Sequence, residues 1–81
     1  MRLDKYLKVS RIIKRRTIAK EAASKERVDI NGKTAKPSAE VKVGDQLTLH
    51  LGLKTIRVRI TSLEPVKDGL MYTLLEEEKR P

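Results

Sequence analysis

The spacing of the apolar residues changes once along this chain of 81 residues, near Glu26. Before that point apolar residues recur every three or four positions, which is typical of an amphipathic helix. After it they alternate with polar residues, which is typical of a half-buried strand. A chain of this length forms one domain. Helices followed by a run of strands predict the α+β class, with two short amino-terminal helices packed on a small, mostly antiparallel sheet.

Two short helices are expected in residues 1–25. The apolar positions of the first helix are Leu3, Tyr6 and Leu7. Ser10 and Arg11 would end this helix. Thr17 is the expected N-cap of the second, because a hydroxyl can accept a hydrogen bond from a free backbone N–H at a helix start. The expected buried stripe of the second helix is Ile18, Ala19, Ala22 and Ala23.

Alternation begins at Val28 and predicts strands joined by turns. Asn31-Gly32 is a strong signal for a two-residue hairpin turn, and Val43-Gly44-Asp45 predicts a turn into the following strand. Two later stretches alternate strictly between apolar and polar residues, so each should bury one face. The core positions expected in these two strands are Leu47, Leu49, Ile56, Val58 and Ile60.

The carboxyl-terminal end carries an acidic run. Lys67-Asp68-Gly69 predicts a hairpin turn, with a final strand at residues 70–75. We expect a single domain at residues 1–75 and a frayed tail at residues 76–81. Glu76-Glu77-Glu78 would lie in that tail, in water, where the pKa values of its carboxylates could not be adjusted for acid–base catalysis.

The content of the chain argues against several functional classes. It has no cysteine, which fits a reducing cytosol, and its one histidine, His50, cannot build a metal site that needs several ligands. The four glycines stand apart, so no glycine-rich loop is present to hold a nucleotide phosphate. No segment approaches the roughly 20 apolar residues of a membrane helix. We expect a soluble cytoplasmic protein that is not an enzyme, with no catalytic residue, no metal, no cofactor and no membrane.

Positive charge is concentrated in the first half of the chain. The net charge is +8, and residues 1–36 hold 12 Lys and Arg against 4 Asp and Glu. Residues 37–81 hold 7 of each kind and are neutral. A surface that serves only solubility would spread its charge, whereas a polyanion site concentrates it. The pattern favours a polyanion partner over a solvated basic face.

Basic side chains of the two expected helices form the candidate RNA-binding surface. Its residues are Arg2, Lys5, Lys8, Arg11, Lys14, Arg15, Arg16, Thr17 and Lys20. Arg15 and Arg16 stand at the amino end of the second helix, where free N–H groups and the positive end of the dipole favour an anion. Their guanidinium groups can hold phosphate through two parallel hydrogen bonds. Thr17 could cap the helix or donate its hydroxyl to phosphate.

The few aromatic residues narrow the kind of nucleic-acid contact. The chain has no Phe, no Trp and two tyrosines. Modules that stack splayed bases on a sheet need exposed aromatic side chains. We therefore expect a surface that contacts phosphates and helical shape, with little base stacking.

An ordered series of short motifs runs through the first half of the chain. The series is Arg2-Leu3-Asp4-Lys5-Tyr6-Leu7, Ser10-Arg11, Arg15-Arg16-Thr17, Ala22, Glu26-Arg27-Val28-Asp29-Ile30-Asn31-Gly32-Lys33, Pro37-Ser38 and Val43-Gly44-Asp45. Together it resembles the RNA-binding domain named after ribosomal protein S-four, also called the alpha-L motif, over roughly residues 1–50. In that family two helices pack on a small sheet and present a basic face to structured RNA. The resemblance implies that this face includes Arg2, Lys5, Arg11, Arg15, Arg16 and Lys20.

The resemblance also implies a cellular role. The domain often accompanies a pseudouridine synthase or a tyrosyl-tRNA synthetase, but here it makes up nearly the whole chain. Short members fall into two groups, the ribosome-associated heat-shock group and the RqcP group. The heat-shock group carries a long basic carboxyl-terminal extension that this chain lacks, so the chain resembles the RqcP group more. That group implies large-subunit ribosomal RNA and peptidyl-tRNA as partners. It also implies an RqcH-like factor that adds alanine tails to stalled nascent chains. We expect the protein to act as a monomer.

Two other functions remain open from the sequence. One is a different role in binding structured RNA on the same fold, such as ribosome assembly. The other belongs to another class, a protein–protein adaptor whose basic face meets an acidic partner. Co-sedimentation with ribosomal particles before and after ribonuclease treatment would separate them, because an adaptor would be indifferent to RNA.

Overall fold

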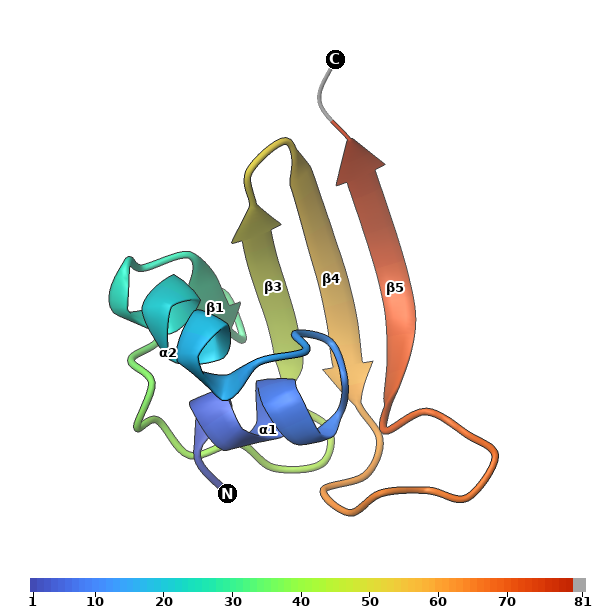
Figure 1. Cartoon of the computed structure of the whole chain (residues 1–81). Helices are drawn as coiled ribbons and strands as arrows, with labels where there is room; N and C mark the ends of the chain where they lie inside the picture. Colours follow the sequence, from blue (N-terminus) through green and yellow to red (C-terminus); the bar gives the residue numbers. More distant parts are fainter. Residues whose placement is uncertain (80–81) are drawn as a thin grey trace.

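The computed structural model, which describes residues 1–79, has two helices on one face of a five-stranded antiparallel sheet (Figure 1). The sheet order is β2-β1-β3-β4-β5. The elements are α1 (Leu3–Val9), α2 (Arg16–Ser24), β1 (Val28–Ile30), β2 (Lys33–Thr34), β3 (Gln46–Leu51), β4 (Lys54–Ile60) and β5 (Tyr72–Lys79). The predicted α+β class is confirmed. In residues 1–79 no helix is long and apolar enough to span a membrane.

Helix α1 forms where the sequence predicts it. Leu3, Tyr6 and Leu7 are fully buried against the sheet, as their spacing requires. Ser10 is the C-cap, and Arg11 follows in the left-handed region with φ 66°. This is the position at which glycine usually ends a helix, because a side chain there is strained. The chain thus places a charged residue at a point where folding alone would favour glycine.

Helix α2 corrects two expectations. It begins at Arg16 with Arg15 as an N-cap that makes no side-chain hydrogen bond, so Thr17 lies inside the helix and is not its cap. Ala19, Ala22 and Ala23 are buried as predicted, but Ile18 is half exposed. At about 100° per residue, Ile18 lies roughly 90° from the centre of the alanine stripe, which places it at the edge of the buried face. The assignment of Ile18 to that face was wrong.

The predicted turns of the first half are confirmed. Asn31 and Gly32 join β1 to β2 with φ 51° and 84°, the left-handed pair of a type I′ hairpin turn. Asn31 also reaches the turn at Val43–Asp45, because its Nδ2 donates to Asp45 Oδ1 at 3.1 Å and its Oδ1 accepts from the Gln46 amide at 2.9 Å. The two turns therefore support each other at one end of the sheet.

The alternating strands β3 and β4 contribute four residues to the buried core. Leu47 and Leu49 of β3 and Val58 of β4 are fully buried, and Ile60 is 1% exposed. Ile56 is only partly buried, because β4 continues beyond the part of the sheet that the helices cover (Figure 1). The predicted phase of both strands is confirmed, with Ile56 at the edge of the core.

The carboxyl-terminal end differs from the expected frayed tail. Residues 76–79 belong to β5, which pairs with β4 along Tyr72–Lys79. The acidic run is neutralised across the strands, since Glu76 pairs with Arg57 at 2.8 Å and Glu77 with Lys54 at 3.0 Å. A cross-strand pairing of this kind is not visible in a local charge count. Arg80 and Pro81, also assigned to that tail, lie outside the described residues.

The connection between β4 and β5 is also longer than predicted. Residues 61–71 form an open loop, with a turn at Lys67–Asp68, in place of the tight hairpin expected at residues 67–69. The final strand consequently starts at Tyr72, two residues later than the predicted start at Leu70.

Candidate nucleic-acid interface

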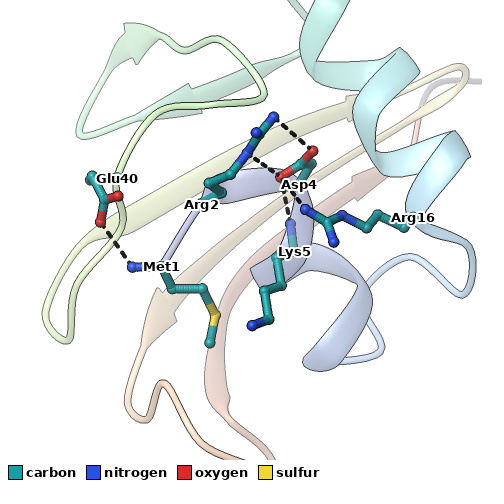
Figure 2. A network of polar contacts seen from close by, with 6 residues as sticks. All are labelled: Met1, Arg2, Asp4, Lys5, Arg16 and Glu40. Carbon is teal, nitrogen blue, oxygen red and sulfur yellow. Dashed lines mark hydrogen bonds and ion pairs between the residues drawn. The ribbon is translucent and has the colours of Figure 1, made fainter.

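A buried carboxylate, Asp4, pairs with two of the predicted basic residues, Arg2 and Arg16 (Figure 2). Asp4 is 2% exposed and sits in the first turn of α1. The guanidinium of Arg2 donates through Nε to Oδ1 at 3.2 Å and through Nη2 to Oδ2 at 3.3 Å. Arg16 approaches the same carboxylate from α2, with Nη2 3.7 Å from Oδ1. A buried carboxylate is costly unless it is paired, so Asp4 holds both arginines in place.

The amino terminus is tied down next to this pair. The Met1 ammonium lies 2.8 Å from Glu40 Oε2, and this hydrogen bond, with the charge of the ammonium, lowers the pKa of the Glu40 carboxyl (Figure 2). The Leu3 amide donates to the Ala39 carbonyl at 2.8 Å. The backbone around Arg2 is therefore held by these contacts, and its side chain is held by Asp4.

The two arginines remain available to a ligand. The side chain of Arg2 is 48% exposed and that of Arg16 is 52% exposed. Two cations on one carboxylate leave a net positive charge. A guanidinium held in a defined orientation can bind phosphate with less loss of rotamer freedom. Lys5, which follows Asp4 on α1, is exposed beside them (Figure 2).

A second group of predicted residues gathers at the other end of α1. Lys8, Arg11 and Lys14 line a shallow hollow together with Val9 and Pro65. Pro65 comes from the loop between β4 and β5, so the carboxyl-terminal half contributes to this part of the surface. The structure thus divides the predicted set into a group around Asp4 and a group around this hollow.

The remaining predicted residues lie on α2. Arg15 is its N-cap, and Thr17 is exposed in its first turn. Lys20 lies one turn after Arg16, on the same side of the helix. Because the Arg15 side chain makes no capping hydrogen bond, the first backbone N–H groups of α2 are open to an anion. All nine predicted residues therefore lie between Arg2, the residue before α1, and Lys20 of α2.

Most of these cations are unpaired. Of the predicted cations, Arg2 and Arg16 form ion pairs within residues 1–79, both with Asp4. No ion pair in that part of the chain involves Lys5, Lys8, Arg11, Lys14, Arg15 or Lys20. The excess of positive charge in the first half of the sequence thus forms a basic surface over the two helices, most of which is not neutralised by ion pairs.

The sequence reasoning missed the role of Asp4. It entered as one of the acidic residues in a charge count and as one letter of a motif, with no role of its own, although it stands beside Lys5 and the buried Leu3. A carboxylate next to a core position in a strongly basic helix is the signal that could have identified it, because such a group needs partners.

The amino-terminal part of the chain matches a family model. The model, described as S4 domain, covers residues 1–47. The chain belongs to the S4 domain family. That span contains both helices, the first strands and all nine predicted RNA-binding residues, whereas β4, β5 and the loop between them lie beyond it.

Curated relatives match almost the whole of this S4-domain chain. The RQC P-site tRNA stabilizing factor of Bacillus subtilis is 52% identical over 98% of the chain and 96% of its own length. The protein of the same name from Helicobacter pylori J99 is 46% identical over 89% of the chain and 92% of its own length. A heat shock protein 15 homolog of Haemophilus influenzae is 36% identical over 85% of the chain but only 53% of its own length.

A solved structure confirms the expected fold of the S4-domain chain. Heat shock protein 15 of Vibrio cholerae, described as trimeric, superposes with a TM-score of 0.75 at 31% identity. The match covers 93% of this chain and 81% of that one. The resemblance drawn from the motifs is therefore confirmed.

Replacing Asp4 tests whether it positions the arginines of this S4 domain. Asp4→Asn adds one positive charge to the surface, yet we expect RNA affinity to fall by about tenfold, equivalent to about 1.4 kcal/mol, because Arg2 and Arg16 lose their anchor. Glu21→Gln is the matched control, since it adds the same charge on the exposed side of α2. We expect the control to bind at least as tightly as the parent protein. Tighter binding by Asp4→Asn, measured by anisotropy with a labelled ribosomal RNA fragment, would show that only total charge matters.

The strained position of Arg11 allows stability and binding to be separated. Arg11→Gly should raise the free energy of unfolding by about 1 kcal/mol, since glycine adopts the left-handed region without strain, while RNA affinity falls. Glu26→Gly is its counterpart at the end of α2, where Glu26 has φ 59°. It should stabilise by a similar amount without weakening binding. Urea denaturation and RNA titration of both variants measure the two effects. If Arg11→Gly and Glu26→Gly lost the same amount of RNA affinity, Arg11 would not belong to the interface.

Proposed function

We propose that this protein is a non-catalytic RNA-binding factor that stabilises P-site tRNA on the large ribosomal subunit during ribosome-associated quality control. The observation that carries the proposal is the arginine pair held on buried Asp4, surrounded by unpaired cations on the two helices. A rigid pair of guanidinium groups suits the phosphate backbone of folded RNA. The names of relatives that share about half of its residues over nearly its whole length support the tRNA assignment.

The proposed binding residues act as a clamp. They are Arg2, Lys5, Lys8, Arg11, Lys14, Arg15, Arg16, Thr17 and Lys20, and they would contact both large-subunit ribosomal RNA and tRNA. The proposed consequence is that peptidyl-tRNA stays in place while an RqcH-like factor adds alanine residues to the stalled chain. The protein would do this in the cytoplasm, as a monomer, by binding alone and without any chemical step.

Sucrose-gradient sedimentation tests this function. Large subunits that carry peptidyl-tRNA should retain the protein, vacant subunits should retain less, and ribonuclease should release it. A variant with both Arg2→Ala and Arg16→Ala should remain at the top of the gradient, whereas Arg59→Ala, on the opposite face of the sheet, should sediment normally.

Each rival function gives its own pattern in the same gradients. Preference for immature particles regardless of tRNA would indicate an assembly factor. Retention that ribonuclease does not change would indicate a protein adaptor. Either pattern would overturn the proposed role.

A further inference from the structure

The loop of residues 61–71 is fixed to α1 at its base. The buried hydroxyl of Tyr6 donates to the Met71 carbonyl at 2.8 Å, and the same carbonyl accepts from the amides of Thr61 at 2.9 Å and Ser62 at 3.1 Å. Burial, with a smaller contribution from Tyr72, raises the pKa of Tyr6 to about 12, so this hydroxyl keeps its proton at neutral pH. The loop is therefore held beside the end of α1 (Figure 1).

A groove of about 550 Å³ runs between the end of α1 and this loop. Val9 and Arg11 line one side, and Val66 and Leu70 line the other. It continues into the hollow of Lys8 and Lys14, with which it shares residues. Its volume lies within the range of small-molecule sites, about 300–1,000 Å³. Together the two hollows form what is called here the α1-end groove.

The two ends of the α1-end groove differ in chemistry. Lys8 and Lys14 stand at one end, Arg11 lines both hollows, and no ion pair within residues 1–79 engages these three cations. At the other end Val66 is 45% exposed and Leu70 is 63% exposed. An apolar surface beside unpaired cations complements a ligand that is flat and apolar in one part and anionic in another.

Asp68 determines the orientation that such a ligand would take in the groove. It is the one acidic residue among those that line the groove, and it lies with Val66 and Leu70, away from the lysines. A carboxylate repels phosphate but accepts hydrogen bonds from the N–H groups of a base edge. The anionic part of the ligand therefore belongs at the lysine end and the base at the loop end.

We propose that the α1-end groove binds one unstacked nucleotide of the RNA, with its phosphate at Lys8, Arg11 and Lys14 and its base against the loop. RNA is commonly recognised through bases that have left the helical stack. The proposal rests on the proposed RNA-binding function and deepens it. It also gives a role to residues 61–71, which the S4 domain model does not cover. Acidic side chains alone would use the cations but would leave Val66 and Leu70 uncovered.

Two RNA hairpins with the same stem test the proposal, one fully paired and one with a single bulged nucleotide. We expect the full chain to prefer the bulged hairpin by about tenfold. Leu70→Ser should bind the paired hairpin normally and lose the preference, as should Val66→Ser. Leu53→Ser is the matched control, because Leu53 is 69% exposed at the β3–β4 turn, away from the groove, and it should keep the preference.

The outcomes separate this proposal from the proposed function. Arg16→Ala should weaken both hairpins equally and keep the preference for the bulge. Equal affinity of the parent protein for the two hairpins, or a preference that survives in both loop variants, would overturn the nucleotide site while leaving RNA binding intact. Failure to bind either hairpin would overturn both proposals. Displacement of both hairpins alike by polyglutamate, with no effect of the bulge, would indicate a surface for acidic protein and overturn the site. Normal melting temperatures confirm that the variants are folded.

Discussion

Leu49→Ala is expected to lower the free energy of unfolding by about 2–5 kcal/mol. Leu49 is fully buried in the middle of β3, where it pairs with Val28 of β1 on one side and Ile56 of β4 on the other. Removing its side chain leaves a cavity between the sheet and the helices that surrounding residues can fill only in part. Small domains have total stabilities of about 5–15 kcal/mol, so this single change removes a large share.

Urea denaturation followed by circular dichroism measures the effect. Leu53→Ala is the control, because its side chain lies in water and exposed positions usually change stability by less than about 0.5 kcal/mol. A stability loss of the same small size for Leu49→Ala would mean that the strand phase is displaced by one residue, which would turn Leu49 to the outer face.

Local patterns predicted the framework of the fold. The helical spacing of Leu3, Tyr6 and Leu7 placed α1, and the alternation around Leu49 placed β3 with its correct buried face. Asn31-Gly32 predicted a hairpin turn because few dipeptides adopt two consecutive left-handed conformations. In each case the signal lies within a few residues of the structure that it determines, which is why a single sequence suffices.

Contacts between distant segments could not be predicted in this way. Glu76 and Glu77 join β5 because Arg57 and Lys54 stand opposite them, and that pairing depends on the register of β4 against β5. Buried Asp4 pairs with its neighbour Arg2 and also with Arg16, which lies twelve positions later on another helix. The basic surface was visible in composition, but its division between Asp4 and the α1-end groove follows from the tertiary fold.

Salt is expected to weaken RNA binding by about a hundredfold to a thousandfold between 50 and 200 mM. Each phosphate that the protein neutralises releases condensed counterions, so the logarithm of the affinity falls linearly with the logarithm of the salt concentration. The slope is about −0.9 per contact on duplex DNA and smaller on single strands. The unpaired cations and the two arginines on Asp4 cannot all touch RNA at once, which leads us to expect roughly four to six contacts.

Variants locate these contacts by the change in slope. Arg2→Ala, Arg11→Ala and Arg16→Ala should each make the negative slope shallower by about one unit, because each removes one phosphate contact. Arg59→Ala is the control. Arg59 is exposed on β4 and pairs in register with Gln46 and Thr73, on the face of the sheet opposite the helices, so the slope should stay unchanged.

The measurement is a titration of the full chain against a labelled large-subunit RNA fragment at several salt concentrations. A flat response would mean that the basic surface over α1 and α2 is only solvated and binds no polyanion. Equal slope changes from Arg16→Ala and Arg59→Ala would mean that RNA contacts both faces of the sheet. Since the charge excess lies entirely in residues 1–36 and both helices fall within that span, we expect the slope to depend on the helical face alone.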